Sequence, residues 1–314
     1  MTSSKPLLND STKRCASEKL EPPYAVHGNA IMVALKNMTI CISVQDVERS
    51  HTALVDVLAL RKQWPRTPYK AEAWEQALRQ AGLLECFSSI PSGLHKGFTV
   101  GYPTLNHVQT PPNSTSLSVY EKEFKEIVNK ELTKERYIGP FPFTTIEAAI
   151  GPFQSSPLSL IPKPGKPGKF RLVQNFSFPI QTSTRFPNLS VNDAITTGLL
   201  PCTWGKFSTI FLLVVRLPPG SQAATQDVAE VYRTIPLHEL QWPAAVMHIS
   251  ETSACIDTCI AFGASPSCGV YGQVADVGAE ILRANGISPL DKWVNDHIFF
   301  RILRIHRHEY NLAR

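Results

Sequence analysis

Proline divides this chain into short segments. The 314 residues include 25 prolines and 17 glycines, and because proline interrupts both helices and central strands, the regular elements should be short and separated by many loops. Hydrophobic residues make up 43 % and charged residues 18 % of the chain, which excludes a disordered polyelectrolyte and a coiled coil. At about 150 residues per domain, the length allows two domains, or one large domain with extensions.

The apolar pattern predicts neither a membrane segment nor a secretory leader. The longest apolar run, 210–215, is far below the roughly 18 residues of a membrane-spanning helix, and the N-terminal sequence MTSSKP has no apolar core. We therefore expect a soluble intracellular protein, cytoplasmic or nuclear, with no membrane partner; the oligomeric state stays open. The cysteines lack paired spacing, so Cys255, Cys259 and Cys268 are expected to be packed thiols rather than metal ligands.

Two amphipathic helices are predicted in the first half of the chain. Apolar residues recur at helical spacing over 71–81, and Gly82 is placed to end that helix. Ser118 and Glu121 have capping-box spacing, so the second helix should begin there and end at Gly139-Pro140. Its interleaved Lys and Glu residues are expected to form a solvated face. Its apolar stripe consists of Leu117, Tyr120, Phe124, Ile127, Val128 and Leu132.

Farther along, short apolar segments alternate with Pro/Gly turns. The segments predicted as strands are 159–161, 170–174, 210–215, 245–249 and 256–261. The stretch 91–113, which is rich in Gly, Pro and Asn, should be irregular. We expect an α+β fold with a poorly defined extension over 1–70, a helical region over 71–140 and a sheet domain over 141–314.

A basic hairpin is predicted between the apolar segments 158–161 and 170–173. Its sequence KPGKPGKFR, residues 163–171, has cations at four of nine positions, namely Lys163, Lys166, Lys169 and Arg171. It is not a P-loop, because the prolines remove backbone donors. Such a tip suits phosphate groups, and an ordinary solvated turn is the alternative. The net charge of 151–206 is +5, as is that of the whole chain.

Three further segments carry polar residues beside predicted turns. Asp227 follows a predicted strand, and Tyr232 comes five residues later. Phe262-Gly263 lies in a Gly/Ser-rich turn that opens a helix, and Asn285-Gly286 closes that helix. Asn295-Asp296 lies in a tight turn between aromatic and aliphatic runs. Each segment alone is a weak signal of function.

The order and spacing of these segments resemble motifs A, B and C of reverse transcriptases, at 225–236, 261–272 and 292–300. The words SPLSLIPK, KFRLV and SVND resemble the fingers motifs. RYIGPF, and KWV before the acidic pair, resemble in particular the DIRS-like reverse transcriptases of tyrosine-recombinase retrotransposons, as found in fungal genomes. The resemblance implies the fingers and palm of a right-hand polymerase, a small antiparallel sheet flanked by helices, with the thumb missing.

The resemblance also implies a reaction, template-directed nucleotidyl transfer supported by two divalent ions, Mg²⁺ or Mn²⁺. Asp227 and Asp296 would bind the metal ions and, with Asn295, would be the catalytic residues. Tyr232 would lie beneath the incoming sugar and select deoxynucleotides. The implied partners are an RNA or DNA template-primer and deoxynucleoside triphosphates. Further contacts to nucleotide or template would come from Lys163, Lys169, Arg171, Phe262 and Gly263.

Motif C departs from the family pattern, which is Asp-Asp, because Asn295 precedes Asp296. Asparagine supplies a carbonyl oxygen without charge, and even lesser changes at metal sites typically cost about 10–100-fold. The chain also ends at Arg314, too soon after motif C for a thumb. We therefore expect a truncated retroelement copy with impaired or absent polymerase activity. The alternatives are a remnant without activity and a non-catalytic nucleic-acid-binding module that uses Lys163, Lys166, Lys169 and Arg171.

Overall fold

A computed structural model describes residues 64–196 and 205–312, together with residues 52, 54–57, 59, 198 and 200. The chain divides into the units Met1–Glu48 and Arg49–Arg314, and every described residue belongs to the second. Most of the extension predicted over 1–70 therefore lies outside the described residues.

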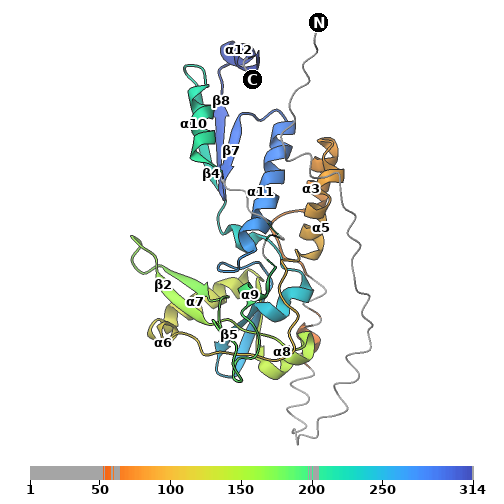
Figure 1. Cartoon of the computed structure of the whole chain (residues 1–314), viewed down its shortest axis with the longest axis vertical. Helices are drawn as coiled ribbons and strands as arrows, with labels where there is room; N and C mark the ends of the chain where they lie inside the picture. The colour runs from red at the N-terminus through yellow and green to blue at the C-terminus, as the bar shows by residue number, and fades with distance from the viewer. Residues whose placement is uncertain are drawn as a thin grey trace, which may run out of the picture. The chain divides into compact units, whose positions relative to one another are not determined.

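Antiparallel sheets form the framework of this unit (Figure 1). A three-stranded sheet of order β1-β6-β5 consists of β1 (Tyr137–Pro142), β6 (Ser253–Asp257) and β5 (Val246–Ser250). A hairpin consists of β2 (Leu158–Pro162) and β3 (Phe170–Gln174). A second three-stranded sheet, of order β4-β8-β7, consists of β4 (Gln222–Asp227), β8 (Asp296–Arg301) and β7 (Leu290–Trp293). Together with the helices, these sheets confirm the predicted mixture of helices and antiparallel strands.

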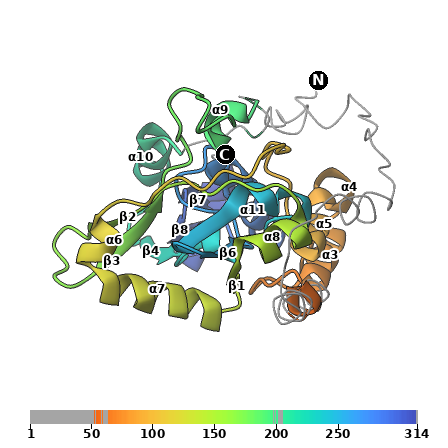
Figure 2. The ribbon, with the colours of Figure 1, turned by 90° about the horizontal axis from the view of Figure 1, so that it is seen from below.

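Helices flank the sheets, and α3 lies beside α5 in both views (Figures 1 and 2). The longer helices are α3 (Ala71–Gln80), α5 (Ser89–Lys96), α7 (Glu121–Thr133), α8 (Phe143–Ile150), α10 (Phe207–Val215) and α11 (Ser267–Ala284). The shorter ones are α4 (Leu84–Phe87), α6 (Ser116–Val119), α9 (Val191–Ala194) and α12 (Arg307–Leu312), with 3₁₀ turns η2 (Val231–Thr234), η3 (Glu239–Ala245) and η4 (Arg304–His306). Among the described helices, none is both long enough and apolar enough to cross a bilayer.

The main core lies around sheet β1-β6-β5 and the helix α11. Its largest fully buried side chains include Trp242, Tyr271 and Phe153. A smaller cluster lies between α7 and the β2–β3 hairpin, where Phe124 and Val128 of the helix join Leu158 and Leu160 of β2. All six residues of the stripe predicted for the second helix belong to this cluster, although Leu117 and Tyr120 come before the start of α7.

Several local predictions match the structure. Helix α3 ends at Gln80, and Gly82 adopts φ 70°, the left-handed conformation that glycine tolerates after a helix. Asn285 caps the end of α11. The basic segment is the tip of a hairpin in which Pro162 pairs with Phe170. Glycine placement and the apolar segments on either side of the Pro/Gly turn therefore located these boundaries.

Other local predictions are wrong. The segment 210–215 is not a strand but part of the helix α10, because an unbroken apolar run has no period that separates the two structures. The stretch 91–113 is only partly irregular, since α5 runs over Ser89–Lys96 and accepts Pro91 in its first turn.

The boundaries of the second helix also differ from the prediction. Helix α7 starts at Glu121 with Tyr120 as its N-cap, and in the described part of the chain no side chain caps it, because Ser118 lies in the separate turn of α6. It ends at Thr133 rather than at Gly139-Pro140. That dipeptide lies in β1 instead, an edge strand, where proline removes no required hydrogen bond.

Candidate functional site

Sheet β4-β8-β7 brings Asp227 beside the acidic pair. Strands β4 and β8 are antiparallel, and their register pairs Asp227 with Asp296. Asn295 lies in the turn between β7 and β8, where its side-chain Nδ2 donates a hydrogen bond to Oδ1 of Asp227. The backbone N–H of Val228 donates to the carbonyl of Asn295 at 3.0 Å. The three candidate catalytic residues therefore lie together at one end of this sheet.

The turn that presents Asn295 has an uncommon backbone. Val294 adopts φ 52°, a left-handed conformation that a β-branched residue rarely takes. Backbone conformations of this kind are retained where the surrounding structure enforces them, and they are frequent at functional sites. Here the pairing of β7 with β8 on one side and the hydrogen bonds of Asn295 on the other hold the turn.

The native side chains of this turn do not fit a pair of divalent ions. Such a site is built from several carboxylate oxygens, and Asp227 and Asp296 supply two carboxylates. Asn295 presents its amide NH₂ to Asp227, so the carboxylate oxygen that would bind a cation accepts a hydrogen bond instead. Among the described residues there is no group of three or more His, Cys, Asp or Glu side chains that could hold a metal ion.

Aromatic rings lie close to one another in the segments that follow Asp227 and β6. Tyr232 is in η2, and its ring centroid is 4.6 Å from that of Phe262. The ring centroid of Tyr271 in α11 is 6.2 Å from that of Tyr232. Tyr232 is half-buried, whereas Phe262 is 52 % exposed. We call Tyr232 and Phe262 the aromatic wall; one of its two rings faces solvent.

Gly263 follows the aromatic wall at a position that only glycine fits. Its φ is 97°, and a Cβ atom there would lie 2.7 Å from the carbonyl oxygen of Gln174 at the end of β3. Asn192 of the SVND segment holds the same turn, because its side chain donates to the Gly263 carbonyl at 3.0 Å and accepts from the N–H of Ser265 at 2.9 Å. The turn is thus fixed against both β3 and α9.

The basic hairpin lies on another part of the unit. Lys166, Lys169 and Arg171 are exposed and Lys163 is half-buried, and within the described ranges none of the four forms an ion pair. Figure 1 draws the hairpin tip apart from β4 and β8. The structure therefore does not bring these cations to Asp227.

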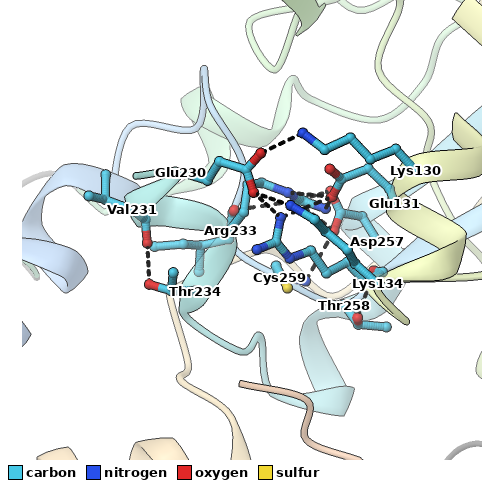
Figure 3. A network of polar contacts seen from close by, with 12 residues as sticks. Lys130, Glu131, Lys134, Glu230, Val231, Arg233, Thr234, Asp257, Thr258 and Cys259 are labelled. Carbon is cyan, nitrogen blue, oxygen red and sulfur yellow. Dashed lines mark hydrogen bonds and ion pairs between the residues drawn. The ribbon is translucent and has the colours of Figure 1, made fainter. Parts of the chain in front are cut away.

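Glu230, three residues after Asp227, is surrounded by cations from the end of α7 and the residues that follow it (Figure 3). Its carboxylate accepts from Lys130 at 2.7 Å, Lys134 at 2.6 Å and Arg136 at 2.8 Å. Partial burial raises the pKa of Glu230, but these hydrogen bonds outweigh burial and hold it well below its ordinary value. Glu230 adopts φ 53°, so the ion pairs hold a backbone turn that glutamate seldom forms.

Arg233 lies at the centre of the same network. Its Nη1 donates to both carboxylate oxygens of Asp257, at 2.8 and 2.7 Å. Its Nη2 and Nε donate to Oε2 of Glu131, at 3.0 and 3.2 Å. All three residues are buried. Burial alone would lower the pKa of Arg233, but the neighbouring Asp257 raises it, and the guanidinium stays charged.

This network was not expected from the sequence. The Lys and Glu residues of the second helix were predicted to form a solvated face, but Glu131 is buried beneath Arg233. Arg136, one residue before β1, reaches Glu230 and extends the contact. The signal that could have identified the network is the charge of Asp257 at the end of a strand whose other residues are apolar or small, because a buried carboxylate requires a cation.

Two of the three clustered cysteines, Cys255 and Cys259, are packed thiols, as predicted. Cys255 and Cys259 are buried, and burial raises the pKa of each thiol to about 12. Both groups are therefore protonated at neutral pH and lack the thiolate character that redox reactions need. Cys268, at the start of α11, is half-buried.

Comparisons with known proteins identify no family for this chain. No family model and no curated protein matches it. Its structure is similar to that of the native protease-reverse transcriptase of prototype foamy virus, with 15 % identity and a TM-score of 0.45, and to the CSH mutant of that protein, with 13 % and 0.46. Each of these matches covers 88 % of this chain and 32 % of the viral chain.

A third similar structure is the foamy viral protease-reverse transcriptase dRH in complex with double-stranded DNA, with 12 % identity and a TM-score of 0.41 over 80 % of this chain and 41 % of that chain. The chain thus spans between about a third and two fifths of the proteins that it resembles. At these identities and scores, the function has to be inferred from the geometry of the site itself.

Proposed function

We propose that this chain is a reverse-transcriptase-like fingers and palm domain, related to the DIRS-like retrotransposon enzymes, whose own polymerase activity is impaired. The observation that carries the proposal is the pairing of Asp227 with Asp296 across β4 and β8, with Asn295 in contact with Asp227. Two chain segments that are distant in sequence thus place acidic side chains at one end of one sheet. The aromatic wall in the segment after Asp227 adds an apolar surface suited to a nucleotide sugar.

The proposed partners are a template-primer and deoxynucleoside triphosphates, and the proposed ions are Mg²⁺ or Mn²⁺. When bound, such ions would activate the primer hydroxyl and support the leaving pyrophosphate. The native residues do not fit the pair of ions, and this is why we assign impaired activity to the native chain. Tyr232, Phe262 and Gly263 would border the nucleotide, and the hairpin cations would contact phosphate groups.

Primer extension tests the catalytic part of this proposal. Native chain and Asn295→Asp are compared on an RNA template with a DNA primer, in the presence of Mg²⁺ or Mn²⁺. We expect Asn295→Asp to exceed the native chain by about 10–100-fold, because it supplies the missing carboxylate. The matched control is Asp227→Ala in the Asn295→Asp background, which should abolish the gain. Equal activity of native chain and Asn295→Asp, or a gain that survives the control, contradicts the proposal.

A second candidate function, nucleic-acid binding without catalysis, is supported by the hairpin cations. Lys166, Lys169 and Arg171 are exposed at the hairpin without ion-pair partners among the described residues. Cations that neutralise phosphates make binding depend on salt, with a slope of about −0.9 per phosphate on duplex DNA. Replacing these three residues by Gln should therefore reduce the slope by about 2 to 3.

The control for this measurement is a surface arginine that already has a partner. Arg79 of α3 is exposed and paired with Glu75 at 2.8 Å, so Arg79→Gln should leave the salt slope unchanged. If the hairpin variant and the native chain bind a duplex with the same slope, the hairpin does not contact phosphate. If the hairpin variant loses binding while no variant extends a primer, the binding function is favoured over the catalytic one.

A further inference from the structure

Arg233 connects two segments that are distant in sequence and that each carry one ring of the aromatic wall. Tyr232 immediately precedes Arg233, and Phe262 follows Asp257 by five residues. The bond between Arg233 and Asp257 is the charged contact that joins these segments. We propose that Arg233 is a positioning residue that sets the spacing of Tyr232 and Phe262, and thereby the choice between deoxyribose and ribose. The inference rests on the proposed function and deepens it.

The geometry of the contact is directional, so it fixes orientation as well as distance. The guanidinium donates from Nη1 to both oxygens of Asp257, and from Nη2 and Nε to Glu131. A planar fork with two carboxylates at its edges allows one arrangement of the arginine. The ring of Tyr137 lies 5.4 Å from the guanidinium carbon and restricts it further. Strand β6, helix α7 and η2 are thus tied to one group.

Backbone hydrogen bonds continue this connection from Asp257 toward Phe262. Oδ1 of Asp257 also accepts from the N–H of Cys259 at 3.0 Å. The N–H of Ile260 donates to the carbonyl of Ile235 at 3.0 Å, and the N–H of Leu237 donates to Thr258 at 2.8 Å. The chain after Arg233 and the chain after Asp257 therefore run side by side, and a shift of one moves the other.

The exposure of the wall explains why a positioning residue is needed there. Phe262 is 52 % exposed and cannot be held by burial alone, so its location follows from the backbone that carries it. A buried ion pair is often no more stabilising than apolar residues of the same volume. What the ion pair contributes here is a fixed orientation of Arg233 relative to Asp257 and Glu131.

Hydrogen exchange of the full chain tests the positioning role without requiring activity. The variants are Arg233→Lys, which keeps the charge and loses the fork, and Glu131→Gln, which keeps an acceptor for Arg233 and leaves Asp257 in place. We expect exchange to accelerate together in 228–234 and 258–263, by about tenfold for Arg233→Lys and less for Glu131→Gln. Leu78→Ala, which removes a fully buried side chain of α3, is the control for general loss of stability.

The outcomes separate the inference from the proposed function. Acceleration in only one of the two segments, or the same pattern in Leu78→Ala, overturns the positioning role. In the Asn295→Asp background, Arg233→Lys should lower the preference for deoxynucleotides over ribonucleotides, as a ratio of kcat/KM, by about tenfold, and Leu78→Ala should not. An unchanged ratio overturns the assignment to sugar selection. Absence of synthesis in Asn295→Asp contradicts the proposed function, and the exchange result still decides the positioning role.

Discussion

The two three-stranded sheets of this molecule differ in what surrounds them. In sheet β1-β6-β5, four of the five residues of β6 are buried, whereas all six residues of β4 in sheet β4-β8-β7 are exposed. The first sheet contributes the packing that stabilises the fold, and the second presents Asp227 and Asp296 to solvent. The candidate catalytic residues therefore lie where substitutions should cost little stability.

The charged groups of the two regions also differ in burial. One pair of variants should therefore show the largest difference in unfolding free energy. Arg233→Met leaves Asp257 buried without its cation and leaves Glu131 with only Arg136, at 3.6 Å, so we expect the free energy of unfolding to fall by about 3–5 kcal/mol. Asp227→Asn, at the exposed end of β4, should change it by no more than about 0.5 kcal/mol. Urea unfolding of both variants measures the difference. Similar losses in the two would mean that the two regions do not differ in burial in solution.

Two isoleucines, one in each sheet, allow the packing of the two sheets to be compared directly. Ile256 of β6 is fully buried and Ile298 of β8 is half-buried. Truncating the first to Ala should cost about 2–5 kcal/mol, because it removes buried methyl groups and leaves a cavity, and the second should cost less than half as much. Chemical denaturation gives both values. A larger loss for Ile298→Ala would show that sheet β4-β8-β7 is covered by something else in solution.

The smallest effect concerns pH and Glu230, which follows β4 by three residues and pairs with Arg136 just before β1. Its folded-state pKa is lowered by Lys130, Lys134 and Arg136 against the opposing effect of partial burial. Its contribution to stability is therefore present above its unfolded pKa of about 4.3 and is lost as pH falls toward the lower folded value. The difference in unfolding free energy between native chain and Glu230→Gln should shrink as the pH falls from about 5 to about 2. A constant difference would mean that Glu230 is not ion-paired in solution.

The sequence predicted the elements whose pattern is local. Hairpin β2–β3 was predicted from two apolar segments around a Pro/Gly turn, and helix α11 from an apolar stripe and the Asn-Gly that closes it. The helix α10 was missed because its apolar run has no period.

In the candidate site, too, the local features could be predicted from the sequence and the long-range contacts could not. The segments that contain Asp227 and Asp296 could be identified by their order, but their pairing depends on the register of β4 and β8, which no local pattern specifies. The contact of Arg233 with Glu131 joins residues 102 positions apart. A partner at that separation depends on how α7 packs, and this is decided by the tertiary structure.

The hydrogen bond from Asn295 to Asp227 gives this end of the sheet a resting state that is independent of the ionic medium. The side-chain N–H of Asn295 lies where a cation would otherwise offset the negative charges of Asp227 and Asp296. The chain should therefore have the same unfolding temperature in the presence of a chelator as in the presence of magnesium. An aspartate at 295 would place three carboxylates together, and the turn would then need dissolved cations to offset their repulsion. The native turn with Asn295 should therefore be ordered without divalent ions, whereas the turn with aspartate at 295 should need them.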